Sequence, residues 1–139
     1  MPADDLKNAM AIAASGMKVQ TQRLKVIAEN VANANAVASD SQTDPYKRKY
    51  MTFKSVFNRE RGVDLVKVDQ VKEDNSDFKL KYEPTHPAAD NKGYVKVSNV
   101  NVFLEMMNWK QAQRTYEANI SAYQAAKSMA SETLRLLRN

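Results

Sequence analysis

The feature that most constrains this chain is a pair of long stretches, one at each end, in which apolar residues recur at three- and four-residue steps. No proline falls between Ala3 and Asp44, and neither glycine nor proline interrupts the pattern from Val102 to Asn139. The 3.6-residue period of an α-helix places such residues on one face. We therefore predict two long helices, one over about residues 4–34 and one from about residue 102 to the C-terminus.

Polar residues at the ends of these stretches predict where the helices begin and end. Asp4 or Asp5 can cap the start of the first helix, and Asn99 or Asn101 can cap the start of the second. The first helix is expected to close within residues 29–35. Asparagine tolerates the left-handed backbone that often terminates a helix, so the asparagines there can replace the missing glycine.

Each predicted helix carries one main apolar seam. In the first helix the seam consists of Leu6, Met10, Ala13, Met17, Gln20, Leu24, Ile27, Val31 and Ala34. In the second helix it consists of Val102, Met106, Trp109, Gln113, Tyr116, Ile120, Tyr123, Lys127, Ala130, Leu134 and Leu137. Such spacing over several heptads is typical of a coiled coil. The expected fold is mainly α with a small β part, its long N- and C-terminal helices paired as an antiparallel coiled coil.

A second apolar stripe runs beside each seam at every seventh position. It consists of Ile12, Val19 and Val26 in the first helix and of Ala122, Met129 and Leu136 in the second. A simple two-helix hairpin needs one stripe per helix, so a second stripe indicates an additional neighbour. That neighbour is either another molecule or the β part of the same chain, and the pattern leaves both interpretations open.

The middle of the chain is irregular and predicted to be rich in β-structure. Alternating apolar residues predict strands near residues 47–57, 63–71, 78–82 and 94–97, and prolines at 84 and 87 predict a rigid turn. This segment has too few apolar residues to fold alone. We therefore expect one structural unit made of an N-terminal helix (1–36), a β-rich segment (37–98) and a C-terminal helix (99–139).

The side chains that catalysis and metal binding require are scarce. The chain has no cysteine and one histidine, which excludes disulfides, thiol catalysis and sites with several histidines. His86 and Asp90 have no nucleophile at a defined spacing. Glu73 and Asp74 are adjacent in sequence, whereas a catalytic pair faces across a cleft. We expect no enzyme activity, no cofactor and no metal.

Charge and hydropathy narrow the expected partners. The net charge of +5 is spread evenly along the chain, whereas a nucleic-acid footprint is usually clustered. The densest basic run, residues 47–49, favours a solvated strand face over a groove for a phosphate backbone or a protein contact. The sequence has no apolar run long enough to span a membrane, and its N-terminus lacks the features of a cleaved signal peptide.

Two polar residues, Gln20 and Asn119, lie near the seams inside the predicted helices. Polar residues at such positions lower stability but can fix the register and the number of partners. Register matters most where many copies stack in one arrangement. The asparagines at the helix ends have a simpler interpretation as caps.

Three motifs resemble those of the bacterial flagellar rod and hook proteins. The first is Ser15-Gly16-Met17-x2-Gln20-x2-Arg23-Leu24 followed by Asn30-Val31-Ala32-Asn33-Ala34, which is similar to the N-terminal signature of that family. The second is Glu105-Met106 followed by Arg114-x-Tyr116-Glu117-Ala118-Asn119, which is similar to its C-terminal signature. The third is Tyr82-Glu83-Pro84-Thr85-His86-Pro87-Ala88-Ala89-Asp90-x2-Gly93-Tyr94-Val95 with Asn99-Val100-Asn101, which resembles the short members of the proximal rod.

The resemblance covers nearly the whole chain and implies a structural role. Members of this family leave the cell through the flagellar type III export apparatus without a cleaved signal peptide. In the periplasm they assemble into a helical tube, the rod, which transmits motor torque to the hook and filament and forms part of the export channel. Their terminal helices pair and form the inner wall of that tube. The resemblance implies no cofactor, nucleic acid or small-molecule substrate.

The partners implied by the resemblance are further copies of the chain, other flagellar rod proteins and, around them, the basal-body membrane ring and the P and L rings. The residues expected at subunit interfaces are Leu6, Met10, Ile12, Met17, Val19, Gln20, Leu24, Val26, Ile27, Val31, Met106, Trp109, Tyr116, Asn119, Ile120, Tyr123, Met129, Leu134, Leu136 and Leu137. The alternative prediction is an intracellular coiled-coil adaptor that binds another helix through one seam.

Overall fold

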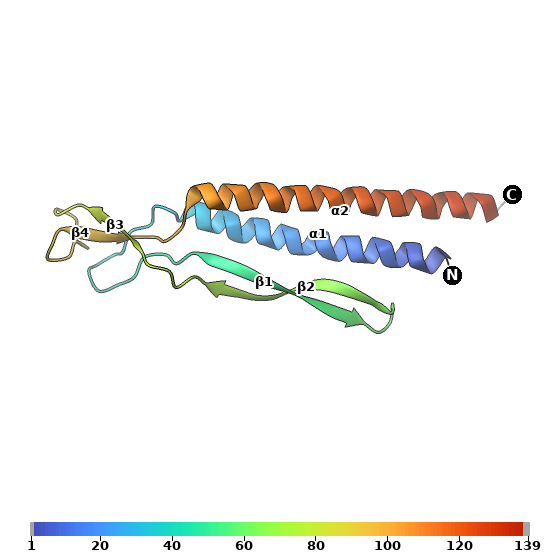
Figure 1. Cartoon of the computed structure of the whole chain (residues 1–139), viewed down its shortest axis with the longest axis horizontal. Coiled ribbons are helices and arrows are strands. Elements are labelled where there is room, and N and C mark those ends of the chain that lie inside the picture. Colours follow the sequence, from blue (N-terminus) through green and yellow to red (C-terminus); the bar gives the residue numbers. More distant parts are fainter. Residues whose placement is uncertain (1, 138–139) are drawn as a thin grey trace. The chain divides into compact units, whose positions relative to one another are not determined.

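The computed structural model describes residues 2–137, which form two helices and four strands (Figure 1). In chain order these are α1 (Pro2–Ala32), β1 (Lys49–Asn58), β2 (Val63–Glu73), β3 (Lys79–Tyr82), β4 (Tyr94–Val97) and α2 (Val102–Leu137). The strands form two two-stranded sheets, β1 with β2 and β3 with β4. The prediction of a mainly α fold with a small β part is confirmed, and the predicted end of the second helix at Asn139 lies outside the described residues.

The chain is divided into two compact units, each built from separate segments. Unit 1 contains the residues up to Leu24, Thr52–Gln70 and the residues from Lys110 onward, and unit 2 contains Lys25–Met51 and Val71–Trp109. Both helices and both strands of the β1–β2 sheet therefore contribute one part to each unit. Over the described residues, neither helix is apolar enough to cross a membrane.

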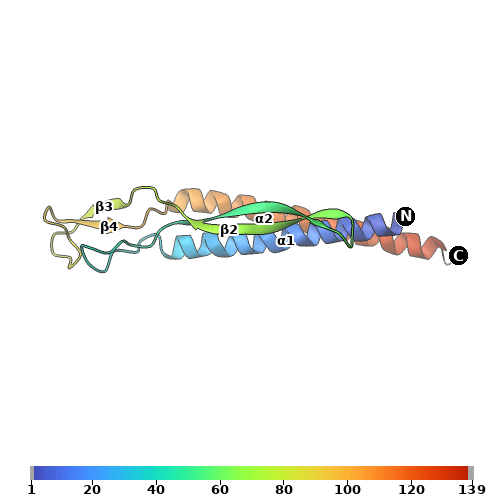
Figure 2. The same cartoon turned by 90° about the horizontal axis from the view of Figure 1, so that it is seen from below.

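In unit 1, α1 and α2 lie side by side and run in opposite directions (Figures 1 and 2). Gly16 lies against the side chain of Asn119, and Nη2 of Arg23 donates to Oε1 of Gln111 at 3.4 Å. As one moves toward the C-terminal end of α1, its contacts therefore move toward the N-terminal end of α2. Every residue of the predicted α1 seam is buried or half-buried, so the pattern identified the inward face of this helix correctly.

The predicted α2 seam packs within unit 1 only in its middle, where Tyr116, Ile120, Tyr123 and Ala130 are half-buried. The most buried positions are Ala112 and Ala126, which the seam did not include, and Asn119 beside them is half-buried. Leu134 and Leu137 of the predicted seam are 62% and 78% exposed. Small residues at 112 and 126 allow the two helices to approach closely.

Gly16 marks the closest approach of the two helices. A Cβ atom at this position would lie 2.7 Å from Nδ2 and 3.1 Å from Cγ of Asn119. Those separations are shorter than ordinary van der Waals contact, so any side chain at residue 16 requires Asn119 to move. The pair therefore fixes how α1 and α2 pack in unit 1.

The β1–β2 hairpin of unit 1 ends in a tight turn. Oδ1 of Asn58 accepts hydrogen bonds from the backbone N–H groups of Glu60 and Arg61 at 3.0 and 3.2 Å, and the Gly62 N–H donates to the Asn58 carbonyl at 2.8 Å. Gly62 has a φ of +67°, which glycine adopts without strain. These contacts hold the turn without using the side chain of Arg59 or Arg61.

The same hairpin packs against α1. The Val66 N–H donates to Oγ of Ser15 at 3.2 Å, and Nδ2 of Asn8 donates to the Arg61 carbonyl at 3.2 Å. Val19 is 4% exposed and lines one cavity with residues 65–68. In the single chain Val19 is therefore covered by the β part, which is one of the two neighbours that the sequence pattern left open for this stripe. Ile12, on the same stripe, is exposed.

In unit 2, β3 and β4 pair antiparallel with Tyr82 opposite Tyr94, and the two rings pack edge to face with centroids 5.3 Å apart. Gly93 has a φ of +82°, and a Cβ there would lie 2.8 Å from the Tyr82 ring. A small apolar cluster centred on Val95 packs behind this sheet. His86 accepts a hydrogen bond from the Ala88 N–H through Nδ1, as expected for a turn residue.

The helix ends confirm one predicted cap and correct two others. Oδ1 of Asn101 accepts from the N–H groups of Phe103 and Leu104 at 3.0 and 3.3 Å, so Asn101 caps α2. The prediction for the start of α1 was wrong, because the helix begins at Pro2 and places Asp4 and Asp5 inside its first turn. There the two carboxylates still favour the positive end of the helix dipole.

The predicted left-handed asparagine at the end of α1 was also wrong. Among the described residues, positive φ is restricted to glycine. Instead, Nδ2 of Asn33 donates to the Glu29 carbonyl at 2.8 Å, and the Asn33 N–H donates to the same carbonyl at 3.1 Å. The Asn33 side chain donates a hydrogen bond to a carbonyl at the helix end, so no residue there needs the left-handed backbone conformation.

The contact between Gly16 and Asn119 predicts non-additive effects. Without a clash, Gly16→Ala stabilises a helix interior by about 1 kcal/mol. We expect that gain in an Asn119→Ala background and its loss or reversal when Asn119 is present. Thermal unfolding of the purified chain followed by circular dichroism, over all four variants, measures this coupling. Additive effects of the two substitutions would contradict the close approach.

Candidate interaction surface

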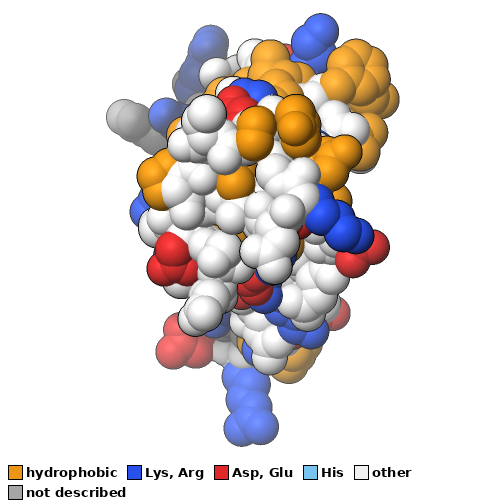
Figure 3. Space-filling view, turned by 90° about the vertical axis from the view of Figure 1, so that its left-hand side faces the viewer, with side chains coloured by type: hydrophobic (Ala, Val, Ile, Leu, Met, Phe, Trp, Pro, Cys, Tyr) orange, Lys and Arg blue, Asp and Glu red, His pale blue; other side chains and the backbone are white. Residues whose placement is uncertain are grey.

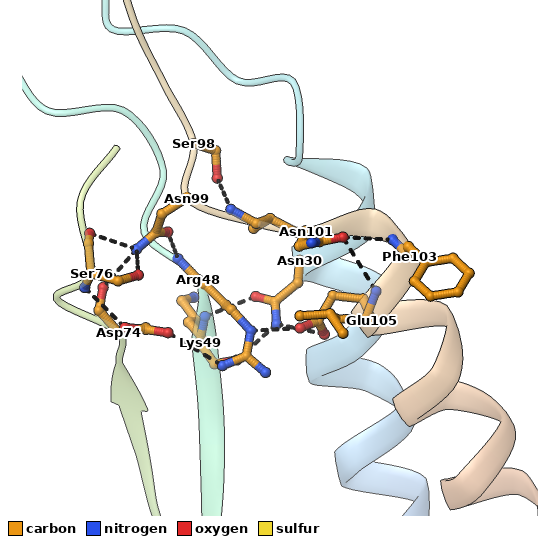
Figure 4. A network of polar contacts seen from close by, with 12 residues as sticks. Asn30, Arg48, Lys49, Asp74, Ser76, Ser98, Asn99, Asn101, Phe103 and Glu105 are labelled. Atoms are coloured by element: carbon orange, nitrogen blue, oxygen red, sulfur yellow. Dashed lines mark hydrogen bonds and ion pairs between the residues drawn. The ribbon is translucent and has the colours of Figure 1, made fainter. Parts of the chain in front are cut away.

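Five polar side chains of unit 2 form a connected network, which we call the polar hub (Figure 4). They are Asn30 in α1, Arg48 just before β1, Asp74 just after β2, Asn99 before α2, and Glu105 in the first turn of α2. Two of them are almost fully buried: Asn30 is 0% exposed and Glu105 is 1% exposed. A buried polar group must be hydrogen-bonded, so the partners of these two decide the local structure.

The side-chain amide of Asn30 binds the backbone of Lys49 in the way that the backbone of a neighbouring strand would. Its Nδ2 donates to the Lys49 carbonyl at 2.7 Å, and its Oδ1 accepts from the Lys49 N–H at 2.8 Å. Oδ1 also accepts from the Tyr46 hydroxyl at 2.8 Å, and Nδ2 reaches Oε2 of Glu105 at 3.1 Å. The end of α1 is therefore attached to the first residue of β1 and to α2.

Arg48 neutralises the buried carboxylate of Glu105. Its Nε donates to Oε1 of Glu105 at 2.5 Å, and its Nη1 lies 3.5 Å from Oδ2 of Asp74. Removing water from a carboxylate is costly, and only a close charged partner with further hydrogen bonds offsets that cost. The guanidinium and the Asn30 amide together supply these contacts. Arg48 thus serves two carboxylates with one positive charge.

Asn99 joins the backbone segments around the hub. Its Oδ1 accepts from the Arg48 N–H at 2.7 Å, and its Nδ2 donates to the carbonyls of Asp74 and Ser76 at 2.9 and 3.1 Å. The Asp74 N–H donates to the Arg48 carbonyl at 2.7 Å. These contacts place the segment that leads into α2 against the end of the β1–β2 sheet where β1 begins and β2 ends.

Two titrating groups of the hub region have shifted pKa values. Burial raises the pKa of the Tyr46 phenol, and the negative charges of Glu29, Glu105 and Glu73 raise it further. The Ser76 N–H lowers the pKa of Asp74 by donating a hydrogen bond to its charged form. Burial opposes this effect, and Arg48 adds to it. Asp74 is therefore a stable negative charge in this region.

Because Glu105 and the Asn101 cap fix the start of α2, the other side chains of its first turns point outward. Six large apolar ones are exposed: Val102, Phe103, Leu104, Met106, Met107 and Trp109. In the space-filling view that faces unit 2, hydrophobic side chains gather in the upper part of the surface, with charged side chains around and below them (Figure 3). In unit 1, α2 exposes four more, which are Met129, Leu134, Leu136 and Leu137.

The expected interface residues fall into three groups in the structure. Buried within the chain are Val19 and Ile27; half-buried are Leu6, Met10, Met17, Gln20, Leu24, Val26, Val31, Tyr116, Asn119, Ile120 and Tyr123; exposed are Ile12, Met106, Trp109, Met129, Leu134, Leu136 and Leu137. Val19 and Ile27 are covered within the single chain, so the interface proposed below uses the other residues. The remaining residues stay predictions. Oε1 of Gln20 is buried and has no hydrogen-bond partner among the described residues.

The sequence pattern missed several residues of this region. Phe103, Leu104 and Met107 lie off the predicted seam yet are strongly exposed, and Glu105 has the most buried side chain of the α2 start. One signal was present, because Glu105 is a single acidic residue within a run of large apolar ones. A lone charge inside an apolar run indicates that the run is not the buried face.

The hub has no arrangement that suggests catalysis. Over the described residues, no group of three or more His, Cys, Asp or Glu side chains converges on a possible metal site. Asp74 and Glu105 share Arg48 between them, so neither faces a cleft as a free acid or base. The arrangement is that of a structural support beneath an apolar surface.

Comparison with known families identifies matches at both ends of the chain. Residues 10–38 match the family described as Flagella basal body rod protein. Residues 91–136 match the family described as Flagellar basal body rod FlgEFG protein C-terminal. The first match contains the Asn30 position of the polar hub, and the second contains Asn99, Glu105 and most of α2.

Curated relatives match over almost the full length. The chain is 41% identical over 135 residues to the flagellar basal-body rod protein FlgC of Agrobacterium fabrum, with 97% of each chain covered. It is 43% identical over 132 residues to FlgC of Escherichia coli O6:H1, covering 94% of this chain and 97% of the relative. FlgC of Salmonella typhimurium is 42% identical over the same shares.

The contacts of Asn30 predict a large effect from an isosteric change. Asn30→Asp replaces the Nδ2 donor by an oxygen that faces the Lys49 carbonyl and Oε2 of Glu105. We expect a loss of about 3 kcal/mol in the free energy of unfolding, as for other broken buried charge contacts. Urea unfolding measures it. The matched control is Asn33→Asp at the same helix end, where only one side-chain contact to Glu29 is lost and the effect should be about 1 kcal/mol or less. Equal effects would contradict the hub.

The lowered pKa of Asp74 predicts an acid-dependent loss of stability. A carboxyl whose pKa is lower in the folded state stabilises the fold fully above its unfolded pKa of about 3.9. That contribution disappears as pH falls through the folded value. The urea midpoint of the unchanged chain should therefore fall more between pH 5 and pH 3 than that of Asp74→Asn. Parallel pH profiles of the two proteins would rule out the role of this carboxylate.

Proposed function

Since this chain belongs to the family of the flagellar basal-body rod protein FlgC, it is a structural subunit of the rod and not an enzyme, and we propose that it assembles there into a helical tube that transmits motor torque and lines the export channel. Its partners are other components of the flagellar rod and basal body. The proposal adds the form of the assembly, its mechanical role and the surfaces that carry it.

The observation that carries this proposal is the outward apolar face of α2. Ten large apolar side chains of this helix are exposed in the single chain, among them Phe103 at 72% and Leu136 at 71%. Full burial of one such side chain contributes about 1.5–3 kcal/mol. An exposed apolar surface of this extent is typical of a protein–protein contact.

The length of the helices supports a mechanical role. α2 alone has 36 residues, and an α-helix rises about 1.5 Å per residue. Two antiparallel helices that pack closely at Gly16 and Asn119 form a stiff element. When such elements are also fixed to their neighbours, twist applied to one subunit passes to the next. We propose that these helices lie along the tube and that their antiparallel pairing is a coiled coil.

The proposed subunit interfaces combine exposed and half-buried residues. On α2 they comprise Met106, Trp109, Tyr116, Asn119, Ile120, Tyr123, Met129, Leu134, Leu136 and Leu137, and on α1 Leu6, Met10, Ile12, Met17, Gln20, Leu24, Val26 and Val31.

We further propose that the chain reaches the periplasm through the flagellar type III export apparatus without a cleaved signal peptide. The absence of cysteine supports this route, because a chain threaded through a narrow channel has no disulfide to reduce. The surrounding membrane ring and the P and L rings are further proposed neighbours. The family membership disfavours the alternative of an intracellular coiled-coil adaptor.

The outward face of α2 predicts the effect of a charge at Met129, which is 53% exposed. Met129→Asp should leave expression and the circular dichroism spectrum of the purified chain unchanged, because more than half of the side chain is exposed to water. It should abolish swimming and remove the chain from isolated basal bodies. Met129→Leu, the matched control, keeps the apolar surface and should swim normally. Normal motility of Met129→Asp would count against this interface.

A further inference from the structure

The described methionines fall into two groups by exposure. The half-buried group lies in α1 and β1 and consists of Met10, Met17 and Met51. The exposed group, which we call the α2 methionines, consists of Met106, Met107 and Met129, with exposed fractions of 49%, 54% and 53%. The strongly exposed thioethers of the described chain therefore all belong to one helix. They also belong to the exposed apolar surface on which the proposed function rests.

Peroxides oxidise an accessible methionine to its sulfoxide. The sulfur atom attacks one oxygen of hydrogen peroxide, so an S–O bond forms as the O–O bond breaks. The other oxygen takes up the proton left on the first and leaves as water. Sulfur is oxidised and the peroxide is reduced, and no further reactant is needed. The chain has no cysteine, so no thiol of its own competes for the oxidant. Because the peroxide must reach the sulfur, the α2 methionines should react before the half-buried group.

A sulfoxide changes the chemistry of the α2 surface without removing its support. It replaces a flexible apolar side chain by a polar one. Burying the sulfoxide oxygen against an apolar partner is unfavourable unless a donor reaches it. In the single chain about half of each of these side chains lies in water, so the oxygen stays hydrated. Oxidation should therefore weaken the binding of α2 to a neighbour and leave the chain folded.

We infer that Met106, Met107 and Met129 are oxidation sites of the unassembled chain, and that their conversion to sulfoxides by a peroxide prevents α2 from binding its neighbour. The first part stands on exposure, whereas the second rests on the proposed function. In the assembled rod, neighbouring subunits cover the same side chains and protect them from the oxidant. Methionine sulfoxide reductases reverse the oxidation, so a chain blocked in this way can recover.

The oxidation sites are tested on the purified full chain. Hydrogen peroxide is added, samples are taken over time, and sulfoxide at each methionine is quantified by peptide mass spectrometry. The α2 methionines should react severalfold faster than Met10, Met17 and Met51. The same reaction in urea is the control, and there all of these methionines should react at similar rates. Equal rates for the two groups in the folded chain would overturn the assignment of the sites.

The effect on binding is tested in cells without any oxidant. Replacing all three α2 methionines by glutamine introduces polar side chains of similar length that imitate the sulfoxide. This variant should keep the circular dichroism spectrum of the unchanged chain, be depleted from isolated basal bodies, and reduce the swimming zone in soft agar severalfold. The matched control replaces the same three residues by leucine and should swim normally. Normal swimming of the glutamine variant, or an equal loss in the leucine variant, would refute the block.

Isolated basal bodies separate this inference from the proposed function. Treated with the same peroxide, their copies of the chain should form sulfoxide at the α2 methionines more slowly than the purified chain does. If the rates are equal, no neighbour covers these side chains and the block is wrong, but the place of the chain in the rod stands. If the chain is absent from basal bodies, the proposed function fails and the block fails with it. The rates measured on the purified chain then still decide the oxidation sites.

Discussion

The structure of unit 2 depends on one buried carboxylate. Glu105 has almost no exposed surface, and an ionised carboxyl in that environment is tolerated only with close donors. Nε of Arg48 and Nδ2 of Asn30 provide them, and each donor comes from a different part of the chain. The end of α1, the start of β1 and the first turn of α2 must therefore meet at one point. A purely apolar contact at this point would allow several alternative packings, whereas these directional bonds allow one.

A second constraint operates in unit 1, where the helices pack through small residues. Ala112, Asn119 and Ala126 lie inward on α2, and Gly16 faces Asn119 from α1. Tyr116, Ile120 and Tyr123 are half-buried beside these small residues. The large apolar residues near the two ends of α2, among them Phe103 and Leu136, are mostly exposed. The small residues therefore hold the helices together in the middle of α2, and the exposed ones are available for contacts with other molecules.

The sequence predicted most of the fold but only part of the surface. All six elements were expected in their observed order, and the α1 seam was identified correctly because large apolar residues fill its inward face. The α2 seam was only partly correct, because Tyr116, Ile120 and Tyr123 are half-buried but its most buried neighbours were missed. Those are residues 105, 112 and 126, a glutamate and two alanines, which a hydrophobicity pattern does not register. The polar hub escaped prediction because its members lie up to 75 residues apart and only the fold brings them together.

In this chain the Asn30 and Glu105 side chains of the polar hub are buried, whereas large apolar side chains of α2 are exposed. This arrangement explains how the single chain can be folded and can still bind other molecules. Hydrogen bonds with fixed geometry hold Asn30, Arg48 and Glu105 inside the chain, so the exposed side chains at the start of α2 keep a defined arrangement before any partner arrives. Association then needs little further ordering of the backbone, and the gain from burying Phe103 or Met107 is not cancelled by lost conformational entropy. For a structural subunit of the rod, this means that the surface at the start of α2 is already ordered when the chain meets its partners.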